Sequence, residues 1–438
     1  MTKVQYVDTR GIDPRILTAC EVVLEGTTSS KGLWVPRKIP KFSDEQILAL
    51  RDGSFIDVMV AFLDEFGFIG KDAIPLNDAV KLVIEAYENF LHDDILNLRP
   101  IDGQGNFILD LCFGPTMSFK DYALALLGKI IPYLLKRKGM RGIVLGATSG
   151  DTGPAGMANV ASEDMFVYII YPDGRTSIGQ EQQMIYLSGK IAQAFAMKGL
   201  TFDDSQFLAK GCFNDQKFLD KLEQKGIKLI SINSINWLRI MAQTAYMFHV
   251  SMKPVFSKGT FPSTPNFVIP SANSGHWLGA WIAKQMGANI GNIVLALNQN
   301  NILERVINTG KHEPSGVIPT LAPAMDIDIS SNFERVLYFI YGSGYTSDCM
   351  VRDQGVFTIL PELFMELKNE ISAYSVSDDE IRKQIKEIYE RLGIIIDPHT
   401  ATAFAFPEKC KDYSGNNVFV STAHPMKFMD TITEVLGP

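Results

Sequence analysis

The sequence predicts an α/β fold in which parallel sheets are built from βαβ units. From Phe107 onward, short runs of β-branched and aromatic residues alternate with stretches of helical periodicity, and these runs end near Gly, Pro, Ser or Asn. That alternation is typical of parallel sheets covered by helices. The 438 residues exceed one ordinary hydrophobic core, so two or three domains are expected. The predicted strands are Phe107–Leu111, Ile143–Leu145, Phe166–Tyr171, Ile227–Ile230, Phe267–Ile269, Ile293–Leu297 and Val418–Val420.

The region before these strands, up to about Leu98, is predicted to be mainly helical. Ser43 and Gln46 form a capping box ahead of an apolar run, and Asn77 precedes apolar residues at helical spacing. This region carries no residues with evident chemistry. We interpret it as a domain that packs beside a catalytic core.

Composition excludes several classes of protein. With 46% hydrophobic and 21% charged residues the chain is typical of a soluble globular protein. Its net charge of −8, without a long basic run, argues against a nucleic-acid partner. Lys129 and Pro132 interrupt the most apolar stretch, so no membrane helix is expected.

The histidines and cysteines indicate neither a metal site nor a disulfide framework. The six histidines show no regular ligand spacing, so no metal site is predicted, and His399 and His424 are interpreted as structural. The five cysteines are odd in number and scattered, and the N-terminus lacks the apolar core of a signal peptide. A reducing cytoplasm fits these observations best.

The stretch Gly114–Ala123 is the best candidate for a reactive site. It follows an extended run and precedes a helical pattern, which places Lys120 where a helix begins. A cation is disfavoured at the positive end of the helix dipole, so the field there helps the amine to lose its proton. A neutral lysine can form a Schiff base with an aldehyde. The alternative is an ordinary surface lysine in the first turn of a helix.

Two further segments are suited to anions. The loop Gly146–Gly153 has glycines and hydroxyls before Pro154, which can stand at the first helical position, so its backbone N–H groups suit a carboxylate or phosphate. It can also be an ordinary strand-to-helix turn. Asn233 and Arg239 span a strand end and a helix start, where a guanidinium can bind phosphate through two bonds. Arg239 alone would more often be solvated or salt-bridged.

The sequence of Gly114–Ala123 resembles the lysine motif of threonine synthases, which are enzymes that depend on pyridoxal 5'-phosphate (PLP). Further segments resemble that family in its own order, and the resemblance runs from about Tyr6 to the C-terminus. Several motifs in one order are far more specific than any one alone. These segments are Gly32–Pro36, Ala147–Gly153, Asn233–Trp237, Asp397–Ala401 and Thr422–Pro425.

The resemblance implies the two-lobed PLP-dependent fold of the tryptophan synthase β-subunit type, preceded by an N-terminal mainly helical domain. The implied domains are residues 1–98 for the helical part, 99–250 for the lobe with the PLP lysine and the substrate loop, and 251–438 for the lobe that binds the cofactor phosphate.

The resemblance also implies roles for single residues. Lys120 would hold the cofactor and shuttle protons, and Asp151 would stand near the pyridoxal 3-hydroxyl. Thr422 would face the pyridine nitrogen, where a hydroxyl leaves that nitrogen largely unprotonated and favours elimination and replacement over transamination. The cofactor phosphate would lie at Ala272, Asn273, Ser274, Gly275 and His276. The substrate carboxylate would lie at Thr148, Ser149, Gly150 and Thr152, and the substrate phosphate at Asn233 and Arg239.

The implied reaction converts O-phospho-L-homoserine and water to L-threonine and phosphate, in a monomer or homodimer. The sequence departs from the family at Phe113, where histidine is usual, and at Ala272, Ser274 and His276. These departures keep a second reading open, which is γ-elimination or γ-replacement on another activated amino acid. A third reading is a PLP-binding homologue that has lost turnover.

Overall fold

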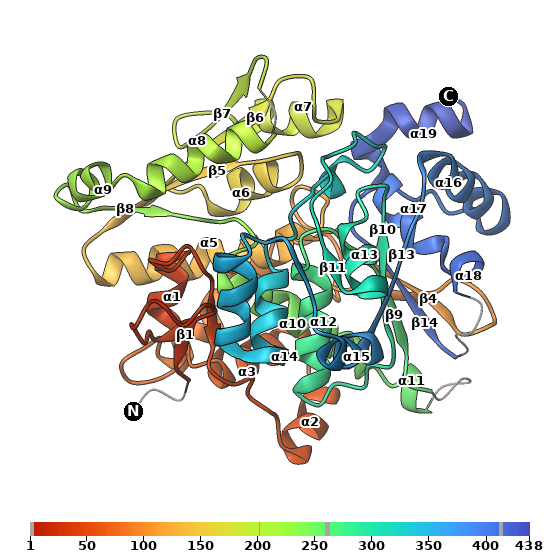
Figure 1. The fold of residues 1–438 in the computed structure, drawn as a ribbon, viewed down its shortest axis with the longest axis horizontal. Coiled ribbons are helices and arrows are strands. Elements are labelled where there is room, and N and C mark those ends of the chain that lie inside the picture. The colour runs from red at the N-terminus through yellow and green to blue at the C-terminus, as the bar shows by residue number, and fades with distance from the viewer. Residues whose placement is uncertain (1–3, 201, 259–262, 411–414) are drawn as a thin grey trace.

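Two parallel sheets organise the molecule, as the sequence predicts. The computed structural model describes residues 4–200, 202–258, 263–410 and 415–438. The larger sheet has the strand order β13-β10-β9-β14-β4-β3, and the smaller has the order β7-β6-β5-β8. All neighbouring pairs in both sheets are parallel except β3 with β4. Figure 1 shows the smaller sheet with α6–α9 at the upper left, the larger sheet at the right, and α10 and α12 in the middle.

The predicted strands all form. Ile227–Ile230 and Ile293–Leu297 have the predicted bounds, Phe107–Leu111 is shifted by one residue towards the N-terminus, and the other four are extended by one or two residues at each end. The larger sheet contains β3 (Asn97–Pro100), β4 (Asn106–Asp110), β9 (Asn266–Pro270), β10 (Ile293–Leu297), β13 (Ile371–Ser375) and β14 (Asn417–Ser421). The smaller contains β5 (Arg141–Ala147), β6 (Met165–Pro172), β7 (Ala192–Met197) and β8 (Ile227–Ile230). Two short antiparallel pairs add β1 (Tyr6–Asp8) with β2 (Trp34–Pro36), and β11 (Lys311–His312) with β12 (Phe357–Thr358).

Helices cover the sheets and form most of the N-terminal region. That region contains α1 (Ala19–Glu25), α2 (Asp44–Arg51), α3 (Phe55–Glu65) and α4 (Leu76–Tyr87). Next come α5 (Lys120–Arg137), α6 (Thr152–Val160), α7 (Ile178–Leu187), α8 (Phe202–Asn214), α9 (Gln216–Glu223), α10 (Trp237–Ser251) and α11 (Val255–Lys258). The rest are α12 (Gly275–Gln285), α13 (Ile302–Thr309), α14 (Phe333–Ser347), α15 (Pro361–Glu370), α16 (Asp378–Leu392), α17 (Pro398–Phe404), α18 (Phe406–Lys409) and α19 (Met429–Leu436).

The capping signals in the N-terminal region are confirmed in part. Ser43 caps α2 in a full capping box with Gln46. The apolar residues after Asn77 are helical, as their spacing predicts, but Asn77 is the second residue of α4, because Pro75 occupies the cap and α4 begins at Leu76. A proline has no N–H to leave unpaired, so it serves well just before a first turn.

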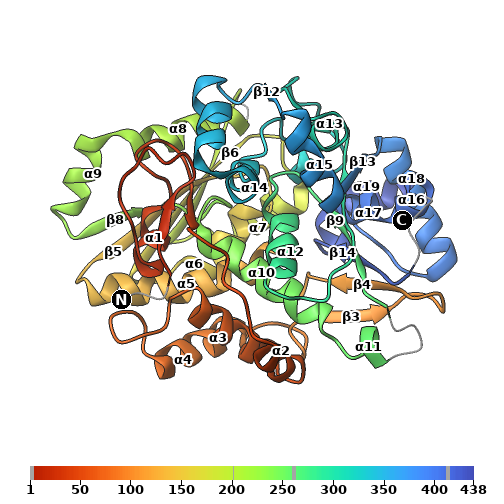
Figure 2. The ribbon, with the colours of Figure 1, turned by 60° about the horizontal axis from the view of Figure 1, so that its bottom comes forward.

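The N-terminal helices support the two helices that carry candidate site residues. Figure 2 shows α3 and α4 beneath α5, and α3 also packs on α10. An aromatic cluster joins these parts, because the ring of Phe42 lies 5.2 Å from those of Phe62 and Phe248. Such pairs add specific geometry to the burial of apolar area. The N-terminal helices thus hold α5 and α10 in place.

Helices α5 and α6 approach so closely that a side chain is excluded between them. A Cβ added to Gly128 on α5 would lie 1.9 Å from the carbonyl oxygen of Asn159 on α6. The two helices therefore hold a fixed spacing, which sets the distance between their N-terminal ends.

The strand pairing crosses the division expected from the sequence. Strand β4 lies in the expected range 99–250, but it pairs with β14 of residues 251–438, and β3 joins the same sheet through β4. The three-part division at residues 98 and 250 stays a prediction.

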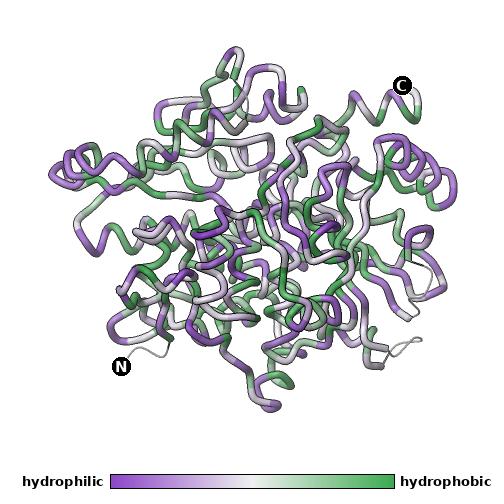
Figure 3. The backbone as a smooth tube through the Cα atoms, in the orientation of Figure 1, coloured by the Kyte–Doolittle hydropathy of each residue, from purple (hydrophilic) through white to green (hydrophobic). Residues whose placement is uncertain are grey.

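Polarity follows the arrangement of the elements. Hydrophilic stretches gather along outer helices such as α9 and α16 (Figure 3), and α9 has no buried residue. Among the described helices, none combines the length and the apolar character needed to cross a bilayer.

Candidate active site

Lys120 is the first residue of α5, as the sequence predicts. The loop before it is fixed to the segment after β14: the N–H of Phe119 donates to the carbonyl oxygen of Thr422 at 2.9 Å, and that of His424 donates to Met117 at 3.0 Å. The lysine side chain is 13% exposed. Burial lowers the pKa of Lys120, the charges of Lys427 and Arg239 add to this effect, and Asp151 opposes it. Burial thus acts in the same direction as the helix dipole and favours the neutral amine.

Asp121 holds the loop from Thr116 to Ser118 in place. Its carboxylate accepts hydrogen bonds from the N–H of Thr116 at 2.9 Å, the hydroxyl of Thr116 at 2.7 Å and the N–H of Ser118 at 3.3 Å. Asn159 of α6 donates a further bond at 2.8 Å. The sequence analysis assigned no role to Asp121. We now interpret it as the residue that orients Lys120.

Asp151 lies between two lysines. Its Oδ2 is 3.2 Å from Nζ of Lys120, and its Oδ1 is 2.9 Å from Nζ of Lys427. Gln180 donates to Oδ1 at 2.8 Å. Burial opposes the charged form, but the two ammonium groups outweigh it and hold the pKa of Asp151 well below its usual range. The buried carboxylate is therefore ionised, and it keeps Lys120 oriented across the gap between α5 and α6.

Replacing Lys427 with methionine is expected to raise the pKa of Lys120. The Lys427 ammonium is 1% exposed and lowers the pKa of Lys120, so its loss leaves Asp151 to favour the protonated amine. Less free amine would then exist at a given pH, and uptake of PLP by the apoprotein would need a higher pH. Stopped-flow absorbance of PLP uptake against pH measures this shift. Lys409→Met, at an exposed pair with Glu380, is the control; an unshifted profile in Lys427→Met would contradict the assignment.

Hydrogen bonds within the loop after β5 hold its conformation. The hydroxyl of Thr148 accepts hydrogen bonds from the N–H groups of Gly150 at 3.1 Å and Gly153 at 3.0 Å. Helix α6 begins at Thr152, so the expectation that Pro154 stands at the first helical position is wrong by two residues. Gly150 packs against Gln180, since an added Cβ would lie 2.5 Å from that side chain.

Arg239 is a buried cation whose charge is not balanced locally. It is 2% exposed, and its Nη1 donates to the carbonyl oxygen of Ile232 at 2.8 Å. Its Nε has no partner among the described residues, and no carboxylate in that part of the chain forms a salt bridge with it. Burial lowers the pKa of Arg239 to about 10, which still leaves it charged. A buried cation without a carboxylate partner is costly, so an anion bound beside Arg239 would stabilise it.

The residues that precede α12 form a further part of the candidate site. Asn273 donates to the hydroxyl of Ser234 at 3.2 Å, and its Oδ1 accepts from the N–H of Ser331 at 2.7 Å. Ser274 has a left-handed backbone (φ 57°) that turns the chain into α12. The N-terminus of α12, with its unpaired N–H groups and positive dipole end, is suited to phosphate.

His399 and His424 are each held by hydrogen bonds within the protein. His399 accepts from the N–H of Ala324 at 3.1 Å through Nε2, and its Nδ1 lies 2.8 Å from Asp397. His424 accepts from the N–H of Met426 at 3.2 Å. Both ring nitrogens of His399 are thus engaged, in line with the structural interpretation. Among the described residues, no group of three or more potential ligands is placed to hold a metal ion.

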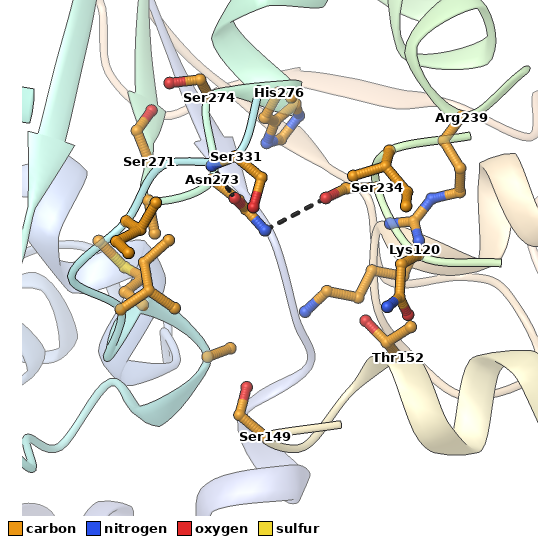
Figure 4. Close-up of a pocket in the computed structure, with 18 of the residues that line it drawn as sticks. Lys120, Ser149, Thr152, Ser234, Arg239, Ser271, Asn273, Ser274, His276 and Ser331 are labelled. Carbon is orange, nitrogen blue, oxygen red and sulfur yellow. Dashed lines mark hydrogen bonds between the residues drawn. The ribbon is translucent and has the colours of Figure 1, made fainter. Parts of the chain in front are cut away.

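One cavity of about 330 Å³ gathers the predicted site residues from both sheets. Figure 4 shows Lys120 and Arg239 on one side of the cavity and Ser271, Asn273 and Ser331 facing them. Gly150 does not line the cavity. The predicted residues that do are Lys120, Thr148, Ser149, Asp151, Thr152, Asn233, Arg239, Ala272, Asn273, Ser274, Gly275, His276 and Thr422.

Several residues of this site were not predicted from the sequence. Gln243 lines the cavity, and Lys427 and Gln180 contact Asp151 from outside it. Phe113, which stands where the family usually has histidine, is not among the lining residues: its ring lies 5.0 Å from that of His92. The cavity wall therefore includes the positions within residues 272–276 at which the sequence departs from the family, and it excludes Phe113.

Comparison with known proteins agrees with this geometry. A sequence profile described as "Threonine synthase N terminus" matches residues 5–87. The chain is 33% identical to a threonine synthase of Pseudomonas aeruginosa, over 98% of this chain and 89% of the relative. It is 34% identical to one of Schizosaccharomyces pombe, over 100% of this chain and 90% of the relative. The PLP-bound threonine synthase structure from Brucella melitensis superposes with a TM-score of 0.89 and 35% identity, covering 99% and 92% of the two chains.

Proposed function

The chain belongs to the threonine synthase family, and on that basis we propose that it converts O-phospho-L-homoserine and water to L-threonine and phosphate. The family is PLP-dependent, and the enzyme is a lyase. The observation that carries the assignment of substrate is the buried guanidinium of Arg239, which lacks a carboxylate partner among the described residues and lines the same cavity as Lys120. That combination suits an amino acid that bears an anionic leaving group.

The residues present fit the cofactor. Lys120 is buried beside an ionised carboxylate, its pKa is lowered, and the N-terminus of α12 faces the same cavity. Lys120 would hold PLP, Asp151 would stand near its 3-hydroxyl and Thr422 near its ring nitrogen. The segment from Ala272 to His276 would hold its phosphate. When bound, PLP supplies electron withdrawal that stabilises carbanions next to the substrate nitrogen.

The protein's own residues supply positioning and proton transfer. Nζ of Lys120 would hold the cofactor between turnovers and then move protons at the α, β and γ carbons of the substrate. The loop from Thr148 to Thr152 would hold the substrate carboxylate. Asn233 and Arg239 would hold the phosphate ester and stabilise the charge that develops as phosphate leaves.

The cavity also supports exclusion of bulk water. Asp151 and Arg239 are buried and the Lys120 side chain is only 13% exposed, so electrostatic interactions with a bound phosphate are stronger here than in water. Water would therefore be admitted as a reactant rather than as bulk solvent, in line with the proposed addition at the β carbon.

A second reading is γ-elimination or γ-replacement on another activated amino acid, and His276 is the observation that favours it. The unbalanced charge of Arg239 supports the phosphorylated substrate instead. Loss of turnover, as in a purely PLP-binding homologue, finds no support in the intact pairing of Lys120 with Asp151.

The relative activity on phosphate and acetate esters tests the substrate. We expect kcat/KM for O-phospho-L-homoserine to exceed that for O-acetyl-L-homoserine by about 10²-fold or more, because a buried hydrogen-bonded charge pair is worth about 2–5 kcal/mol. Steady-state assay of both esters on the PLP-loaded protein measures this. Equal values would favour the second reading.

We also propose a cytoplasmic location, because the five cysteines are odd in number and scattered along the sequence. The oligomeric state, monomer or homodimer, stays a prediction.

A further inference from the structure

A groove of about 870 Å³ lies apart from the cavity at Lys120. The two have no lining residue in common, although the same two helices contribute to both. Gly275 and Glu334, at the starts of α12 and α14, line the cavity, whereas Trp281 and Tyr338, further along the same helices, line the groove. The groove is therefore a separate site, and the proposed reaction assigns it no role.

The groove is basic although the chain as a whole is acidic. Arg37, Lys38 and Lys41 line it, and all three are exposed. None of the three forms an ion pair with another described residue, and no acidic side chain among those described lines the groove. In a chain of net charge −8, three unpaired cations at one site attract an anion.

Backbone contacts hold the segment that carries these cations. The N–H of Arg37, directly after β2, donates to the carbonyl oxygen of Gln5 at 2.8 Å, and the N–H of Phe42 donates to that of Met286 at 3.4 Å. The buried ring of Phe42 packs against those of Phe62 and Phe248. The cations thus stand on a stretch that is anchored at both ends.

Aromatic rings line the same groove. The ring of Phe339 lies 6.1 Å from that of Trp281 and 5.6 Å from that of Tyr338, and all three residues are among the lining residues. The indole N–H of Trp281 has no acceptor among the described residues. Burial raises the pKa of Tyr338, and the charge of Arg37 opposes this shift, so the cation lies close to the phenol. Charged and aromatic groups thus belong to one surface.

Helix α14 is interrupted where it lines the groove. Gly342 has backbone angles (φ 83°, ψ 173°) that are not helical, and a Cβ added to it would meet no atom within 4 Å. The groove is therefore open at this kink. A volume of about 870 Å³ is larger than a simple ion needs and lies in the range of sites for small organic ligands.

We propose that this groove binds a small aromatic phosphate, a class that includes aryl and nucleoside phosphates. The guanidinium of Arg37 and the two ammonium groups would hold the phosphate. The rings of Trp281 and Tyr338 would pack against the aromatic part of the ligand. The inference goes beyond the proposed function and does not depend on it, because the groove has no lining residue in common with the cavity at Lys120.

Three probes separate the charge of the ligand from its ring. α-Naphthyl phosphate carries both, α-naphthol has the ring without the charge, and inorganic phosphate has the charge without the ring. Isothermal titration of the PLP-loaded protein measures the dissociation constant of each. We expect α-naphthyl phosphate to bind about tenfold more tightly than either of the other two, because only this probe can use both the cations and the rings.

Two groove variants locate the binding. Tyr338→Ala should raise the dissociation constant of α-naphthyl phosphate about fivefold and leave that of inorganic phosphate unchanged. A triple variant should raise it about tenfold, since each exposed ion pair contributes up to about fivefold. It combines Arg37→Gln, Lys38→Gln and Lys41→Gln. The matched control removes three exposed charges on or next to α9, which line neither the groove nor the cavity: Lys217→Gln, Lys221→Gln and Lys225→Gln. Thermal unfolding checks that each variant folds.

Arg239→Met separates the groove from the cavity at Lys120, where a phosphate could also bind. Binding of α-naphthyl phosphate that persists in Arg239→Met and weakens in both groove variants, but not in the control, supports the proposal. Binding that is lost in Arg239→Met and kept in the groove variants belongs to the cavity and would overturn it. The proposal also fails if the wild type does not bind α-naphthyl phosphate, or if α-naphthol or inorganic phosphate binds equally well.

Discussion

Lys120→Ala is expected to lower kcat for threonine formation by at least about 10³-fold, since one amine both holds the cofactor and moves protons. The lysine side chain is only 13% exposed, and its Nζ lies 3.2 Å from Asp151. The fold should survive, because Asp151 keeps its contacts with Lys427 and Gln180. Steady-state assay of phosphate release, with circular dichroism as a check on folding, measures the effect.

The control for this variant is Lys136→Ala. Lys136 lies in the last turn of the same helix and is exposed, so its removal changes the charge of α5 without touching the cavity. Its kcat should match that of the wild type. A Lys120→Ala protein with turnover comparable to the control would contradict the role of Lys120.

Arg239→Met is expected to lower kcat/KM for O-phospho-L-homoserine by about 10²-fold or more, because it removes the buried cation that would hold the phosphate. The same change should leave the stability of the apoprotein unchanged or raised. A buried charge without a carboxylate partner is costly, and methionine fills a similar volume. Kinetic assay and thermal unfolding in phosphate-free buffer measure the two effects on the same preparation.

Arg335→Met is the matched comparison. Arg335 is also fully buried, but its guanidinium donates to the carbonyl oxygens of Trp34 at 3.0 Å and Ile235 at 2.5 Å and to Asn332 at 2.5 Å. Its loss leaves several acceptors unpaired and should lower the free energy of unfolding by about 3 kcal/mol. If Arg239→Met proved equally destabilising, Arg239 would be a structural arginine and the phosphate role would fall.

Local patterns in the sequence were sufficient to locate most of the sheets. The β-branched runs at β5, β6, β8, β9, β10 and β14 lie inside strands that the structure bounds within two residues. Strand β7 was missed because Ala192–Met197 contains no β-branched residue and is largely exposed. Strand β13 contains a single isoleucine, so no run marked it.

The candidate site was predictable where its residues lie in contiguous segments. The lysine motif and the loops at 148–152 and 272–276 were each identified within one stretch, and the fold brings them to one cavity. Lys427, Gln180 and Gln243 could not be identified this way. Each stands on an element whose sequence is ordinary, and only the tertiary contacts with Asp151 or with the cavity reveal it.

The most direct test of the central claim is product stoichiometry. O-Phospho-L-homoserine is given to the purified, PLP-loaded protein, and phosphate and L-threonine are quantified in the same tube. The proposed function predicts equal amounts of the two products. Phosphate without threonine would contradict it and assign the protein to γ-elimination or γ-replacement instead.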